Sequence, residues 1–138
     1  MNPAFFGTWK LDKSRSTGKE AFAKAMGVPD EKFAIFDKLE LTVTIAPEGS
    51  DYKYGFEFAG GPTTQSTSYI VTIGKPIEVT ALDGSKAELV LNVEGDTVKE
   101  SYTTDRGNWT TTRTVSGNEM TLVSVAGDAK LTQVLVKA

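Results

Sequence analysis

The most constraining feature of this chain is an alternation of apolar and polar residues with a period of two. Apolar residues occupy every second position of Leu39–Ile45, and Tyr52, Tyr54, Phe56 and Phe58 repeat the pattern in the next run. Successive side chains of a β-strand point to opposite faces, so these runs predict strands with one buried face. Runs of the same kind follow at Ser68–Ile73, Ile77–Ala81, Lys86–Val93, Thr97–Thr103, Asn108–Val115, Glu119–Val125 and Lys130–Val136.

Short turn sequences separate the runs. They are rich in Gly, Pro, Asn and Asp, as in Pro47–Asp51, Asp83-Gly84 and Ser116–Asn118, and these residues favour tight turns. With a first run near Phe6–Leu11, about ten short strands follow one another along the chain. We therefore predict an all-β fold, an antiparallel up-and-down barrel or sandwich, in which closure of the sheet would remove its exposed edges.

The alternation stops between Thr17 and Leu39, where two helices are predicted. Thr17-Gly-Lys-Glu20 has the Thr-x-x-Glu form of a capping box at the start of the first helix. Its apolar residues, Phe22, Ala25 and Met26, follow at helical spacing, and Gly27 is placed to end the helix.

The second predicted helix begins near Pro29, which two acidic residues follow, an arrangement that suits a helix N-terminus. Phe33 and Phe36 give this helix an apolar stripe. A segment this short cannot form a domain, so its stripes must pack on something. We expect a two-helix lid, at about residues 17–39, over an open end of the barrel; the alternative is a helix pair along the outside of the sheet.

Composition narrows the classes of function. The chain has 138 residues, so we expect one domain over 1–138, and its net charge of −3 comes from 15 basic and 18 acidic residues without a block of like charge. Nucleic acid is therefore an unexpected partner. The absence of Cys and His removes thiolate chemistry, the commonest general base and the commonest metal ligand. We expect no enzyme, no cofactor and no metal.

The N-terminal sequence has no basic start followed by a long apolar run, and no stretch is long enough to cross a bilayer. We therefore expect a cytoplasmic protein. The two predicted helices carry four lysines and four acidic residues, so charge gives no clear prediction of docking on acidic membranes. A transient membrane contact through the helical lid is an expectation, as is a monomeric state.

Arg113 is the most informative single residue. In the strand predicted at Asn108–Val115 it shares a face with Trp109 and Thr111, so it should point inward. A buried guanidinium keeps its charge and needs an anion, a carbonyl or ordered water as a partner, and a ligand head group is one candidate. Glu100 shares a face with Tyr102; we favour its pairing in the interior, for example with Arg113, over contact with a ligand hydroxyl or a catalytic role.

The order of these features resembles the intracellular lipid-binding protein family, which includes fatty-acid-binding and cellular retinoid-binding proteins. Phe6-Gly-Thr-Trp-Lys-Leu11 resembles the family's opening strand, and Phe22–Val28 resembles the end of its first helix. The similarity continues from Ile73 to Ala138. The resemblance implies a ten-stranded antiparallel β-barrel, or β-clam, capped by two helices around a cavity that holds lipid.

The resemblance also implies a site for the ligand head group. Many members bind a carboxylate with two arginines and a tyrosine. Arg113 falls on the first arginine, whereas Gln133 and Leu135 stand where the second arginine and the tyrosine would be. An amide has no charge but keeps its donors and adds an acceptor, so Arg113 and Gln133 could hold a carboxylate less electrostatically, or a neutral group.

Other expected site residues come from inward strand positions and from the resemblance. The expected cavity lining is Tyr54, Phe56, Glu100, Tyr102, Trp109, Thr111, Leu122 and Leu135. The expected portal residues are Phe22, Phe36 and Asp83.

The resemblance implies a non-catalytic carrier that binds a long-chain fatty acid or a similar hydrophobic ligand inside the barrel. The alternatives are a binder of a neutral lipid such as a retinoid, a lipid-directed enzyme with Glu100 or Tyr102 as acid or base, and a structural or storage protein with a filled interior.

Overall fold

The structure, a computed structural model, describes residues 1–61, 64–80 and 85–138. A short 3-10 helix at Pro3–Phe5 precedes the strands, and two α-helices lie between the first two strands. The strands are β1 (Gly7–Thr17), β2 (Glu40–Glu48), β3 (Asp51–Ala59), β4 (Gln65–Val71), β5 (Ile77–Thr80), β6 (Lys86–Glu94), β7 (Thr97–Thr104), β8 (Gly107–Ser116), β9 (Glu119–Ala126) and β10 (Ala129–Lys137). The helices are α1 (Lys19–Ala25) and α2 (Asp30–Asp37).

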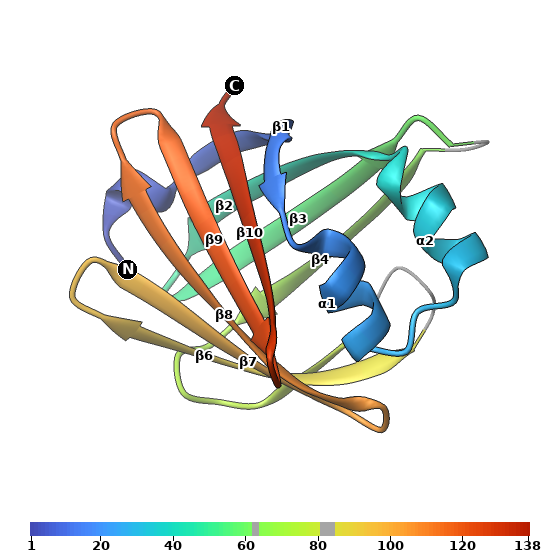
Figure 1. Ribbon diagram of the computed structural model, residues 1–138. Helices are drawn as coiled ribbons and strands as arrows, with labels where there is room; N and C mark the ends of the chain where they lie inside the picture. Colours follow the sequence, from blue (N-terminus) through green and yellow to red (C-terminus); the bar gives the residue numbers. More distant parts are fainter. Residues whose placement is uncertain (62–63, 81–84) are drawn as a thin grey trace.

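The strands form one antiparallel sheet that curls into a nearly closed barrel (Figure 1). Its order is β4-β3-β2-β1-β10-β9-β8-β7-β6-β5, so each strand pairs with its sequence neighbours and β1 pairs with β10. In the described part of the chain, β4 and β5 are the two edges of the sheet. This confirms the predicted barrel and excludes the sandwich.

The alternation of the sequence matches the burial of the strands. Val43 and Ile45 of β2 and Leu89 and Leu91 of β6 are buried, whereas their polar neighbours Thr44, Glu88 and Asn92 are exposed. Burial of such a side chain contributes about 1.5–3 kcal/mol relative to exposure. The inward faces of both halves of the sheet therefore form the core.

Two strand predictions were wrong at their ends. The predicted first strand stopped at Leu11, whereas β1 continues to Thr17, which pairs with Thr132. An irregularity between Asp12 and Thr17 breaks the register, so a simple alternation could not predict this extension. The fourth strand begins at Gln65, three residues before the predicted start, because polar residues at the barrel opening pair with β3.

The predicted capping box at Thr17–Glu20 was also wrong. Thr17 belongs to β1, and the N-cap of α1 is Gly18, with φ of +81° and no side-chain cap. A Cβ at Gly18 would lie 1.9 Å from the carbonyl oxygen of Lys130, so this close approach needs glycine. Gly27 does end α1 as predicted: its N–H and that of Val28 donate to the carbonyls of Lys24 and Ala23, which is a Schellman motif.

The two helices cover one end of the barrel, as predicted (Figure 1). Phe22 of α1 packs edge-to-face on Trp109 of β8, with ring centroids 6.4 Å apart. Trp109 is half-buried and shares the inward face of β8 with Arg113, so α1 lies over the interior and not on the outside of the sheet. Lys19 and Asp37 link the two helices by an ion pair of 2.5 Å.

Among the residues that the structure describes, no helix has the length and apolar character needed to cross a membrane.

Candidate functional site

Arg113 lies inside the barrel, as the alternation predicts, with 3% of its surface exposed. Its partner is the carboxylate of Glu100, which β7 directs to the same interior face. Arg113 Nε donates to Glu100 Oε2 at 2.5 Å, and Nη2 donates more weakly to Oε1 at 3.4 Å. The predicted pairing of Glu100 with Arg113 is therefore confirmed.

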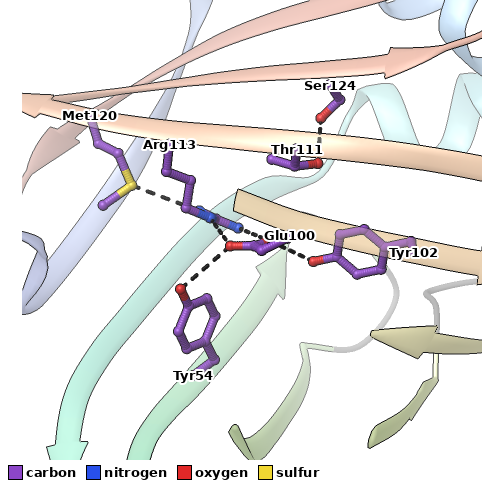
Figure 2. Close-up of polar contacts among 7 residues, drawn as sticks. All are labelled: Tyr54, Glu100, Tyr102, Thr111, Arg113, Met120 and Ser124. Carbon is purple, nitrogen blue, oxygen red and sulfur yellow. Dashed lines mark hydrogen bonds and ion pairs between the residues drawn. The ribbon is translucent and has the colours of Figure 1, made fainter. Parts of the chain in front are cut away.

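Two tyrosines complete the environment of Glu100 (Figure 2). The Tyr102 hydroxyl donates to Glu100 Oε1 at 2.6 Å, and the Tyr54 hydroxyl lies 3.4 Å from Oε2. Tyr54 comes from β3, on the far side of the interior from β7. Each carboxylate oxygen thus has a guanidinium and a phenol as donors.

The electrostatics of this cluster keep its two phenols and its guanidinium protonated. Burial, together with the charge of Glu100, raises the pKa of Tyr54 and of Tyr102 well above the usual value for a phenol. Burial alone would lower the pKa of Arg113, but the charge of Glu100 outweighs it and raises that pKa. Both phenols therefore remain donors and the guanidinium remains a cation at neutral pH.

The remaining contacts of Arg113 are weak. Its Nη1 lies 3.7 Å from the sulfur of Met120, and the guanidinium carbon lies 5.6 Å from the ring centre of Tyr54. The cluster has one buried positive and one buried negative charge, which compensate each other. Arg113 is consequently a satisfied group and not a free cation that awaits an anion.

A cavity of about 250 Å³ opens between the two edge strands; we call it the barrel cavity. Its walls are mostly apolar and aromatic, with a polar rim from the first residues of β4. The lining residues are Phe56, Phe58, Gln65, Ser66, Thr67, Tyr69, Val79, Thr80, Ala87, Tyr102 and Trp109.

A second cavity of about 280 Å³ lies between the helices and the strands β1 and β10; we call it the lid cavity. Both helices and both strands contribute apolar and polar residues to its lining. The lining residues are Leu11, Lys13, Ser16, Lys19, Phe22, Ala23, Met26, Val28, Phe33, Phe36, Asp37, Leu39, Leu131 and Gln133.

Comparison with known proteins agrees with this architecture. A model of the lipocalin / cytosolic fatty-acid binding protein family matches residues 3–137. The chain belongs to this family. The resemblance inferred from the sequence is therefore confirmed.

Individual relatives are similar to this chain over most of their own length. The intestinal fatty acid-binding protein of Bos taurus is 32% identical over 121 residues, which is 85% of this chain and 86% of that protein. The liver fatty acid-binding protein of Schroederichthys bivius is 27% identical over 93% of this chain and 94% of its own.

A solved structure of a Schistosoma mansoni fatty acid binding protein, in complex with arachidonic acid, has a TM-score of 0.88. The two sequences are 19% identical, and the match covers 98% of this chain and 96% of the Schistosoma mansoni chain. At this identity the likeness shows the shared fold. Family membership supports the expected class, a non-catalytic lipid-binding protein of the cytoplasm.

The structure separates the two residues expected to contact the head group. Arg113 and Gln133 each pair with Leu122 of the strand between them, so their backbones lie two strand spacings apart, roughly 10 Å. Leu122 is buried on the same inward face. Gln133 lines the lid cavity, whereas Arg113 belongs to the cluster with Glu100 and lines neither cavity among the described residues.

The other expected site residues divide between cavity and core. Phe56, Tyr102 and Trp109 line the barrel cavity, and the expected portal residues Phe22 and Phe36 line the lid cavity. The rest of the expected lining is buried and lines neither cavity: Tyr54, Glu100, Thr111, Leu122 and Leu135. Asp83 lies outside the described residues.

Thr111 and Ser124 are hydrogen-bonded to each other at 2.8 Å, so these two hydroxyls satisfy one another within the core.

Sequence reasoning missed Tyr69, Lys13 and Ser16 as lining residues. Tyr69 stacks on Tyr54 at 5.9 Å between ring centres, and its place two residues before the buried Val71 could have revealed its inward direction. Lys13 and Ser16 lie in the irregular part of β1, where no simple alternation assigns a face.

Proposed function

We propose that this protein is a reversible carrier of a long-chain fatty acid or a similar hydrophobic ligand, bound inside the barrel without chemical conversion. The observation that carries this proposal is the mostly apolar barrel cavity, lined by Phe56, Tyr69 and Trp109. Support comes from relatives named for fatty acid binding and from a structure of the same fold in complex with arachidonic acid.

The hydrocarbon chain supplies most of the binding free energy in this proposal. Burial of a methylene contributes about 0.8 kcal/mol, so a chain of about sixteen carbons offers on the order of 10 kcal/mol before ordering costs. A charge-assisted hydrogen bond contributes about 1.5–3 kcal/mol. The head group therefore decides orientation and selectivity more than affinity.

Delipidated protein tests the carrier function directly. We expect saturable binding of a fluorescent fatty-acid analogue and its displacement by unlabelled long-chain fatty acid. Mass spectrometry of lipids that co-purify with the protein should identify the class of natural ligand. Absence of saturable binding to any fatty acid, retinoid or fluorescent lipid would contradict the proposal.

A neutral lipid is the second candidate ligand, and the Arg113–Glu100 pair favours it. Because Glu100 compensates the charge of Arg113, a head group beside this pair meets no excess positive charge. A fatty acid and the alcohol of equal chain length, compared in the same displacement assay, distinguish the two ligand classes. A preference for the alcohol would support the neutral-lipid candidate.

The sequence predicted Arg113 and Gln133 as head-group contacts, and this prediction can be tested separately from the carrier function. A ligand carboxylate could contact Arg113 only by displacing Glu100, because Glu100 Oε2 already accepts a hydrogen bond from Arg113 Nε at 2.5 Å. A larger loss of affinity for fatty acid than for alcohol in Arg113→Ala would support direct contact. Equal losses would contradict it.

We also propose that the carrier is a monomer that contacts membranes transiently through its helices. Ile35 of α2 has 55% of its surface exposed and offers an apolar contact. Vesicle sedimentation with wild-type protein and Ile35→Ser should show weaker association of the variant, and light scattering should give the mass of one chain. Equal association of both proteins would contradict the proposed contact surface.

A further inference from the structure

Lys13 lies in the wall of the lid cavity and forms no ion pair with any residue that the structure describes. The ion pair of Lys19 with Asp37 compensates the other lysine of this wall. In the part of the chain that the structure describes, no carboxylate or hydrogen-bond acceptor contacts the Lys13 ammonium. Lys13 is half-buried beside apolar side chains, and an anion would stabilise its charge there.

Ser16 adds an unsatisfied hydroxyl to the same wall. Its Oγ is buried and has no hydrogen-bond partner among the described residues. Native proteins leave few buried hydroxyls unpaired, so such a group calls for an explanation such as a bound ligand or water. In a regular strand Lys13 and Ser16 would face opposite sides; the irregularity between Asp12 and Thr17 brings both to the lid cavity.

Gln133 supplies the third polar group. It lies on β10, directly before Val134, which pairs with Asp12 where the regular part of β1 ends, and it lines the lid cavity together with Lys13. Its amide makes no hydrogen bond within the described residues, although its side chain is half-buried and lines the cavity. The side chains of Lys13, Ser16 and Gln133, which carry an ammonium, a hydroxyl and an amide, therefore line one pocket, and these donor types are suited to a carboxylate.

The rest of the lid cavity suits the beginning of a hydrocarbon chain. Phe22, Met26, Phe33 and Phe36 surround the three polar groups. Phe22 also packs on Trp109, which lines the barrel cavity, so this aromatic pair connects the walls of the two cavities. At about 280 and 250 Å³, each cavity falls below the roughly 300 Å³ at which small-molecule pockets begin, so a long ligand needs both.

We propose that the carboxylate of the bound fatty acid is held in the lid cavity by Lys13, Ser16 and Gln133, and not beside Arg113. The hydrocarbon chain then passes between Phe22 and Trp109 into the barrel cavity. This inference rests on the proposed carrier function and specifies its head-group site. Glu100 already satisfies Arg113, and among the described residues that line the two cavities Lys13 is the cation without an ion-pair partner.

The test compares a fatty acid with the alcohol of equal chain length in wild-type protein and in Lys13→Met. The variant should weaken fatty-acid binding by about tenfold or more, the effect of one charge-assisted hydrogen bond, and leave alcohol binding within about twofold. Lys10→Met is the matched control, because Lys10 lies on the same strand but is exposed and lines neither cavity. It should leave both affinities unchanged.

Ser16→Ala should weaken fatty-acid binding less than Lys13→Met does, because it removes a neutral donor. The paired change of Glu100→Leu with Arg113→Met should retain the preference for fatty acid over alcohol.

The outcomes distinguish this inference from the carrier function. If wild type binds fatty acid saturably and Lys13→Met binds it equally well, the lid-cavity site is overturned and the carrier function stands. If the preference for fatty acid disappears only when Arg113 and Glu100 are replaced, the inference is also overturned. If wild type binds neither ligand, both proposals fail.

A measurement on wild-type protein removes any dependence on folding of the variants. In NMR spectra, addition of fatty acid should shift the Lys13 side-chain and Gln133 amide resonances and leave the Arg113 Nε resonance nearly unchanged. Addition of the alcohol should shift Lys13 much less. A response of Arg113 without a response of Lys13 would overturn the proposal.

Discussion

The guanidinium of Arg113 is buried against the carboxylate of Glu100, and neither charge can remain in the core without the other. Transfer of an ion from water into a protein interior costs several kcal/mol, which the partner and the hydrogen bonds of Tyr54 and Tyr102 offset. The side chains of the pair are 4% and 0% exposed, so solvent screens them little. At the scale of single residues, this cluster is therefore a sensitive point of the fold.

Removal of one member of the pair should be much more damaging than removal of both. Glu100→Leu leaves the Arg113 charge uncompensated and should lower the free energy of unfolding by about 3–5 kcal/mol. The double change with Arg113→Met should recover most of that loss, because the remaining side chains are apolar. Urea denaturation of the two variants measures the difference. A single variant as stable as wild type would disprove the coupling.

At the scale of elements, the start of α1 depends on how closely the chain passes β10. Gly18 adopts a positive φ and leaves no space for a Cβ against the Lys130 carbonyl. This contact fixes where β1 ends and where the helical pair begins. The position of the helices, and hence the shape of the lid cavity, follows from it.

Gly18→Ala should therefore destabilise the protein more than an equivalent change at an open turn. Gly95 is the matched control, since it has φ of +58° and a Cβ at this position would meet no atom within 4 Å. The left-handed conformation alone costs a non-glycine residue roughly 1–2 kcal/mol. Gly18→Ala should exceed that cost because the backbone must also move. Equal shifts of the denaturation midpoint for both variants would contradict the proposed close approach.

At the scale of the whole molecule, the buried tyrosines join the two sides of the barrel opening. Within the described residues β4 and β5 form no ladder with each other, yet Tyr69 of β4 stacks on Tyr54, whose hydroxyl reaches Glu100 on β7. Burial, together with the charge of Glu100, raises the pKa of Tyr69 as well as the pKa values of Tyr54 and Tyr102. The raised pKa values of these three tyrosines therefore depend on the folded barrel, because the barrel buries them.

Stability should fall as pH rises above about 10, the pKa of a phenol in an unfolded chain. Below that pH both states hold the phenolic protons, and stability is unaffected by them. Above it, the unfolded chain releases protons that the folded protein retains, so ionisation favours unfolding by roughly 1.4 kcal/mol per pH unit for each tyrosine.

Denaturation midpoints between pH 9 and 11 measure this slope. Tyr102→Phe, with one phenol fewer, should have a shallower slope; identical slopes would refute the assignment.

The period-two alternation determined the barrel, because strand geometry converts spacing along the chain directly into an inner and an outer face. It placed Arg113, Glu100 and Tyr54 inside, and turn residues such as Gly27 marked where elements end.

Only the tertiary structure decided which of these groups meet. Tyr54 reaches Glu100 across 46 residues, and the register that puts Leu122 between Arg113 and Gln133 is a property of three strands together. The irregularity in β1 that brings Lys13 and Ser16 to one cavity has no local pattern, since it results from pairing with β10.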